Sequence, residues 1–185
     1  MKKTITTALV ALAFMAGASS CKQDKMQENP FLAEYDTPYE IPPFEQIKLE
    51  HYMPALQAGI EEHNAEIKAI VDNEETPTFD NTILALDRSG RTLDKVAAVY
   101  FALSESNSSK EMQEMGEEFE SLYQAHSDEM MMNDGLFERV KYLYDRRDSL
   151  GLAPDQHLAV ENMYKDFTRN GALLDAEKKE QLKAL

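Results

Sequence analysis

The stretch LEHYMPALQAGIEEHNAEIKAIV (residues 49–71) decides the fold class of this chain. Its apolar residues recur every three or four positions, the spacing that gathers side chains on one face of an α-helix. This stripe comprises Leu49, Tyr52, Met53, Leu56, Ile60, Ile67, Ile70 and Val71. A half-buried strand would alternate apolar and polar residues instead. The segment therefore predicts a long amphipathic helix, in which Pro54 either starts the regular part near its own first turn or kinks it.

The same spacing recurs along the rest of the chain, between short polar breaks. Stripes occupy residues 79–100, 112–130, 136–144 and 157–167, and Asp175 can cap a sixth helix. We find no convincing strand, and the short loops favour packing of successive helices as antiparallel hairpins. The sequence predicts an all-α fold of about six helices between residues 43 and 185.

Local signals place some of the helix ends. Ser108 followed by Glu111 matches a capping box, in which side chains satisfy free amides of the first helical turn. Asn170-Gly171 is a usual helix stop. Gly90 lies on the apolar stripe of residues 79–100, so we expect one continuous helix there, with the glycine allowing another backbone to approach closely.

Composition limits the classes of function. The 185 residues carry a formal net charge of −15, which argues against a nucleic-acid binder and against electrostatic docking on anionic lipid. Hydrophobic residues make up 43% of the chain, which is too many for disorder over its whole length. The single cysteine, Cys21, excludes an intrachain disulfide and a cysteine-based zinc site.

The first twenty residues have the pattern of an export signal. A basic start and an apolar run are followed by small residues, as in a secretory signal peptide over residues 1–20. Cys21 follows at once, an order that resembles a bacterial lipobox, although Ala18 stands where leucine is preferred. We expect acylated Cys21 to anchor an exported envelope protein, with residues 21–42 as an extended tether. The alternative is ordinary secretion with a free thiol.

The four histidines give no zinc-protease motif, because none begins H-E-x-x-H. His63 and Glu66 are three residues apart on one predicted helix, but in so acidic a chain we interpret them as a solvated face. His126 lies on an apolar stripe, and we expect a core histidine with one satisfied hydrogen bond. Motifs for a nucleophilic serine or a phosphate loop are also missing. We assign no catalytic and no metal-binding residue to this chain.

Five segments follow one another along the chain: NPF (29–31), PPFEQIKLEHYMPALQAGIEEHNAEI (42–67), PTFDNTILALDRSG (77–90), LFERVKYLY (136–144) and FTRNGALL (167–174). In this order they resemble the N-terminal region of the thimet-oligopeptidase and bacterial peptidyl-dipeptidase family of zinc metallopeptidases. The resemblance covers nearly all of residues 29–185. PTFDNTILALDRSG is its most specific part.

This resemblance implies a helical scaffold that forms one wall of a channel for short peptides. The family's catalytic domain carries H-E-x-x-H and lies far downstream, so no zinc ligand or base transfers to any residue here. We therefore expect residues 43–185 to be the truncated N-terminal part of a zinc-dependent peptidyl-dipeptidase, inactive alone and without bound zinc. The helix that runs to Leu185 without a stop signal fits this expectation.

Two other classes of function stay open. The chain can be a stand-alone helical envelope lipoprotein that binds a peptide or protein partner without chemistry. It can also be a structural spacer of the envelope, a hypothesis that is supported only by the acidic helices.

Overall fold

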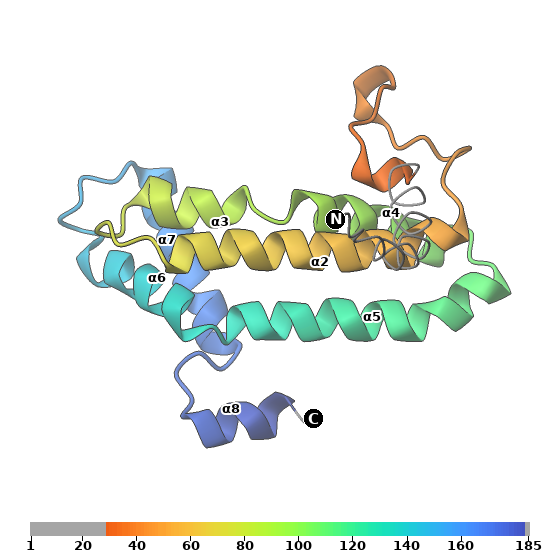
Figure 1. Cartoon of the computed structure of the whole chain (residues 1–185). Coiled ribbons are helices and arrows are strands. Elements are labelled where there is room, and N and C mark those ends of the chain that lie inside the picture. Colours follow the sequence, from red (N-terminus) through yellow and green to blue (C-terminus); the bar gives the residue numbers. More distant parts are fainter. Residues whose placement is uncertain (1–28, 184–185) are drawn as a thin grey trace, which may run out of the picture.

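The computed structural model describes residues 29–183, and all regular elements in this range are helical. Figure 1 shows their order along the chain. The elements are α2 (Leu49–Val71), the π-helical η3 (Phe79–Leu84), α3 (Ala85–Asp87), α4 (Arg91–Ser106), α5 (Lys110–Met131), α6 (Asp134–Arg146), α7 (Pro154–Arg169) and α8 (Ala176–Lys183). No strand occurs in the described range, so the predicted all-α fold is confirmed.

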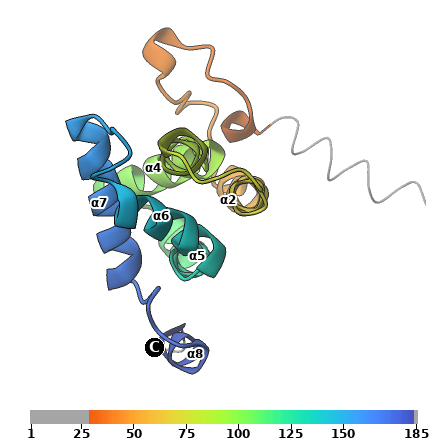
Figure 2. The ribbon, with the colours of Figure 1, turned by 90° about the vertical axis from the view of Figure 1, so that its left-hand side faces the viewer.

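Helix α2 is the centre of the arrangement, with α4 along one side and α5 along another (Figures 1 and 2). The chain reverses direction between α2 and α4 and again between α4 and α5, as expected for helical hairpins. The junction of α5 and α6 is an exception, because α6 continues in about the direction of α5. Helices α6 and α7 pack together at one end of α2.

The buried apolar side chains form two separate clusters, which we call the first core and the second core. The first core contains Phe31, Tyr52, Ala55, Leu56, Leu93, Val96, Val99, Tyr100, Met112 and Phe119. The second core contains Ile67, Ile70, Ile83, Leu136, Phe137, Val140, Leu143, Val160, Phe167 and Ala172. Helix α2 contributes to both, with its N-terminal half in the first core and its C-terminal half in the second.

Residues 29–48, before α2, are irregular apart from two short 3₁₀ turns, Pro30–Leu32 and Pro38–Glu40. Its beginning is fixed to the bundle, because Phe31 is fully buried in the first core. Lys95 of α4 donates hydrogen bonds to the carbonyl oxygens of Phe31 and Ala33. These contacts place Phe31 in the core although we expected the helical domain to begin at residue 43. The predictions for residues 1–20 and Cys21 lie outside the described residues.

Two local predictions are wrong in detail. The expected helix over residues 79–100 is broken, because Gly90 has a left-handed backbone (φ 71°) and precedes α4. The N-cap of α5 is Ser109, not Ser108, and its side chain accepts the amide hydrogen of Met112. The expected ending of α7 is confirmed: Gly171 follows it with φ 91°.

Gly59 allows α2 and α4 to approach closely. A β-carbon at this position would lie 2.8 Å from the backbone nitrogen of Leu93. We therefore expect Gly59→Ala to lower the free energy of unfolding by about 1–3 kcal/mol, because the helices must move apart. Urea denaturation measures this, with the exposed Gln57→Ala of the same helix as the control. A gain in stability, the usual effect of Gly→Ala in an open helix, would contradict the prediction.

None of the helices among residues 29–183 is both long enough and apolar enough to cross a membrane.

Candidate functional site

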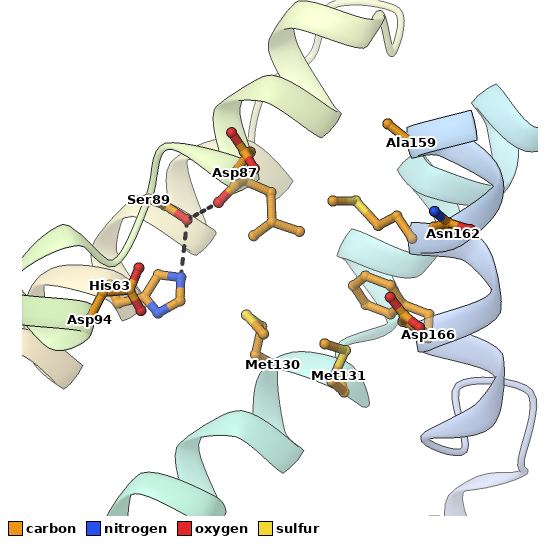
Figure 3. A pocket seen from close by; sticks show the side chains of 12 residues that line it. His63, Asp87, Ser89, Asp94, Met130, Met131, Ala159, Asn162 and Asp166 are labelled. Atoms are coloured by element: carbon orange, nitrogen blue, oxygen red, sulfur yellow. Dashed lines mark hydrogen bonds between the residues drawn. The ribbon is translucent and has the colours of Figure 1, made fainter. Parts of the chain in front are cut away.

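A cavity of about 350 Å³ lies between the α3–α4 junction, the C-terminal end of α5, and α7 (Figure 3). It adjoins both α2 and the second core. Its lining consists of His63, Leu86, Asp87, Ser89, Asp94, Met130, Met131, Ala159, Asn162, Met163, Asp166 and Phe167. This volume falls within the range of about 300–1,000 Å³ typical of ligand pockets.

A hydrogen-bonded pair of histidines stands at one wall of the cavity. His63 of α2 is 8% exposed and His126 of α5 is 5% exposed. The Nε2 atom of His126 lies 2.9 Å from Nδ1 of His63. On its other side, Nε2 of His63 lies 3.0 Å from Oγ of Ser89. The three side chains thus link α2 and α5 with the α3–α4 junction.

The hydrogen-bond partners fix the positions of the protons in this chain. The Ser89 hydroxyl donates its single hydrogen to the carbonyl oxygen of Leu86, at 2.7 Å. Ser89 therefore accepts a hydrogen from Nε2 of His63, which leaves Nδ1 of His63 to accept one from Nε2 of His126. The remaining nitrogen, Nδ1 of His126, carries no hydrogen when the ring is neutral. It is buried and has no partner among the described residues.

The left-handed turn at Gly90 makes room for this arrangement. A β-carbon on Gly90 would lie 3.0 Å from Nδ1 of the His63 ring. The amide of Gly90 donates to the Glu66 carboxylate, at 2.7 Å, which holds the turn against α2 one helical turn beyond His63. Glycine is suited to this position both by its positive φ and by its small size.

Burial keeps both histidines neutral at neutral pH. Loss of hydration lowers the pKa of His63, and the Glu66 and Asp94 carboxylates oppose this shift. Loss of hydration also lowers the pKa of His126, with a further lowering by His63 and an opposing effect of Glu129. A proton added to Nδ1 of His126 would be a buried donor without an acceptor, which is costly.

The structure corrects one expectation for the histidines and confirms another. His126 is a core histidine with one satisfied hydrogen bond, as predicted. His63 was expected on a solvated face, but it is buried, because its face of α2 packs against His126 of α5 and Ser89. Its neighbours in sequence, Glu61 and Glu62, are exposed. The remaining two, His51 and His157, are only partly buried and lie outside the pair.

The pair does not have the geometry of a zinc site. Nδ1 of His63 accepts a hydrogen from His126 and Nε2 of His63 donates one to Ser89, so Nδ1 of His126 is the one nitrogen of the pair without a partner among the described residues. Among residues 29–183, no three His, Cys, Asp or Glu side chains are grouped closely enough to hold a metal ion. We therefore derive no chemical step through a metal from these residues.

The chain resembles known peptidases over most of its length. It is 39% identical over 157 residues to a dipeptidyl carboxypeptidase of Escherichia coli and 38% identical over 160 residues to that of Salmonella typhimurium. These matches cover 85% and 86% of this chain. It is also 27% identical over 153 residues, 83% of the chain, to oligopeptidase A of Escherichia coli. No family model matches the chain.

The matched part is a minority of each relative. The matches cover 23% and 24% of the two dipeptidyl carboxypeptidases and 22% of oligopeptidase A. The chain thus spans about a quarter of the length of the curated relatives that it matches.

Proposed function

Since the chain belongs to the thimet-oligopeptidase family, we propose that it is the helical N-terminal region of an exported, lipid-anchored peptidyl-dipeptidase. The observation that carries this proposal is the 39% identity to a dipeptidyl carboxypeptidase over 85% of the chain. The complete protein would remove dipeptides from the C-termini of short peptides with the help of zinc. Its metal ligands and general base would come from residues outside this chain, since no position here matches H-E-x-x-H.

In this proposal the helices contribute binding surface and shape rather than reacting groups. Metallopeptidase chemistry needs about three protein ligands, an open metal position for water, and a nearby carboxylate base. The helices of this chain would form part of the wall of a channel that admits short peptides and excludes folded proteins.

The activity of the chain alone is the first test. We expect the purified 185-residue chain, supplied with zinc, to release no dipeptide from an N-terminally blocked pentapeptide above the buffer rate. The same assay on a longer protein that includes the downstream region should show release that a chelator abolishes. Chelator-sensitive turnover by the short chain would show that the active site has been misplaced. An inactive longer protein would refute the peptidase function.

The lipid anchor is tested separately. We expect Cys21→Ser to move the protein from the membrane fraction to the soluble fraction, because the thiol is the atom that would carry the acyl chain. Mass spectrometry should find a lipid on Cys21 of the parent and none on the variant. The neighbouring Gln23→Ser is the control and should keep the lipid. Parent protein that begins at Met1 and carries no lipid would contradict the prediction.

A further inference from the structure

The cavity beside His63 has carboxylates on two opposite sides. Asp87 and Asp94 lie on the side of the α3–α4 junction, and Asp166 faces them from α7 (Figure 3). The lining contains no lysine and no arginine. None of the three carboxylates forms an ion pair with a residue in the described range. All three are exposed to solvent, so they are free to pair with a positively charged ligand at the rim of the cavity.

The space between these carboxylates is apolar. Met130 and Met131 at the end of α5 contribute thioether side chains (Figure 3), as does Met163 of α7. Phe167 lines the cavity and also belongs to the second core. Methionine side chains adapt to the shape of a flexible apolar ligand. A flexible aliphatic stem with a charged end matches such a lining, because the stem covers apolar surface while the charge remains at the polar rim.

The arrangement of the carboxylates favours an organic cation over a metal ion, and two further observations favour a cation of either kind. Asp166 stands across the cavity from Asp87 and Asp94, and no group of His, Cys, Asp or Glu in the described range could hold a metal. The other titratable side chain in the lining, His63, is kept neutral by its burial, which lowers its pKa, so that it does not repel a cation. The net charge of −15 adds a long-range attraction for positive ligands.

We propose that this cavity binds an arginine or lysine side chain of a peptide, with the stem on the methionines and the charged end between Asp94 and Asp166. The choice of a peptide as the source of the side chain rests on the proposed function. In the complete protein, the cavity would make peptides with a basic residue better ligands than peptides without one.

The test measures the binding of short peptides to the purified 185-residue chain. Its methionine methyl groups are labelled, and binding is followed by NMR. The probes are blocked pentapeptides of alanine whose central residue is arginine, lysine, norleucine or glutamate. Norleucine has an apolar stem without a charge and so separates the two contributions. We expect the arginine and lysine peptides to bind about tenfold more tightly than the norleucine peptide, which is about 1.4 kcal/mol. The largest changes in chemical shift on binding should be those of the methyl groups of Met130, Met131 and Met163.

The double variant Asp94→Asn, Asp166→Asn should remove the preference for the basic peptides while it leaves binding of the norleucine peptide unchanged. Asp36→Asn is the matched control, since Asp36 is exposed and lies outside the cavity. The methyl spectrum of each variant shows at once whether the fold is retained. A higher salt concentration should weaken binding of the arginine peptide more than binding of the norleucine peptide.

Several results would overturn the proposal: equal binding of the arginine and norleucine peptides, shifts confined to other methionines, or no binding at all. Butylguanidine bound as tightly as the arginine peptide would show a site for small free organic cations and refute the peptide source. A failure of the proposed function can be distinguished from a failure of this inference. If the longer protein hydrolyses peptides but the cavity binds none, only this inference is wrong; if the cavity binds but no hydrolysis occurs, only the function is wrong.

Discussion

Replacing Phe119 by alanine is expected to lower the free energy of unfolding by about 3–5 kcal/mol, the usual cost of deleting a buried phenylalanine ring. Phe119 is fully buried in the first core. Its ring stacks on Tyr100 of α4 with 3.9 Å between centroids and also meets Phe101 edge-on. The substitution therefore leaves a cavity at the contact between α4 and α5, where the surrounding rings are held by several other contacts.

A loss of this size approaches the whole stability of an ordinary domain, which is about 5–15 kcal/mol. Urea denaturation followed by circular dichroism gives the difference. Phe44→Ala is the matched control, because Phe44 is 50% exposed and lies outside both cores. It should change stability by no more than about 0.5 kcal/mol. Similar losses for the two variants would mean that the first core does not hold α5 in place.

The second large effect is a loss of stability in acid that arises from the pair of His63 and His126. Both histidines have pKa values below the ordinary 6.5 in the folded protein. The unfolded chain therefore binds more protons than the folded one once the pH falls below about 6.5, and stability decreases with falling pH. Each histidine contributes up to about 1.4 kcal/mol per pH unit until its folded form also takes up a proton.

The charged groups around the pair limit the loss of stability in acid. Glu66 on α2, Asp94 on α4 and Glu129 on α5 favour the protonated rings and so limit the lowering of the pKa. Above about pH 7 the contribution to stability is complete and constant, because both rings are neutral in the folded and unfolded states alike.

The double variant His63→Gln, His126→Gln tests the effect. Its free energy of unfolding should depend less on pH between about 5 and 7 than that of the parent, because glutamine does not titrate. Gln57→Ala, the exposed and non-titrating position of the same helix used above, is the control and should leave the parental pH dependence unchanged. Equal pH slopes in the parent and the double variant would show that the pair is not responsible for acid sensitivity.

The fold was predictable because the helical period is regular and long. The stripe of residues 49–71 predicted helix α2, since its apolar residues keep their spacing for six turns. The start of the helix was left open by Pro54, which lies inside α2, five residues after its first residue Leu49. The break at Ser89-Gly90 was not predictable from periodicity, because Gly90 continues the apolar stripe while its backbone is left-handed. The turn at Gly90 lies against the His63 ring, which is distant in sequence, so only the folded structure reveals this contact.

The site was less accessible to prediction than the fold. A signal for the burial of His63 exists, because it lies four residues after Gly59 and four before Ile67, both on the buried face of α2. The adjacent glutamates concealed that signal. The partner His126 is 63 residues away in sequence, and only the packing of α5 on α2 reveals it. The cavity likewise depends on where α7 crosses, which no local pattern specifies.

The division into two cores has a consequence for how the protein opens. Regions of a protein that share few apolar contacts can unfold separately as local cooperative units. Here α2 is common to both cores, and the polar chain of His126, His63 and Ser89 lies between them. Transient release of α6 and α7 would leave the first core intact, so the amide hydrogen of Ile67 would exchange sooner than that of Leu56, which lies beyond the first turn of the same helix. The molecule thus has a graded stability along a single helix.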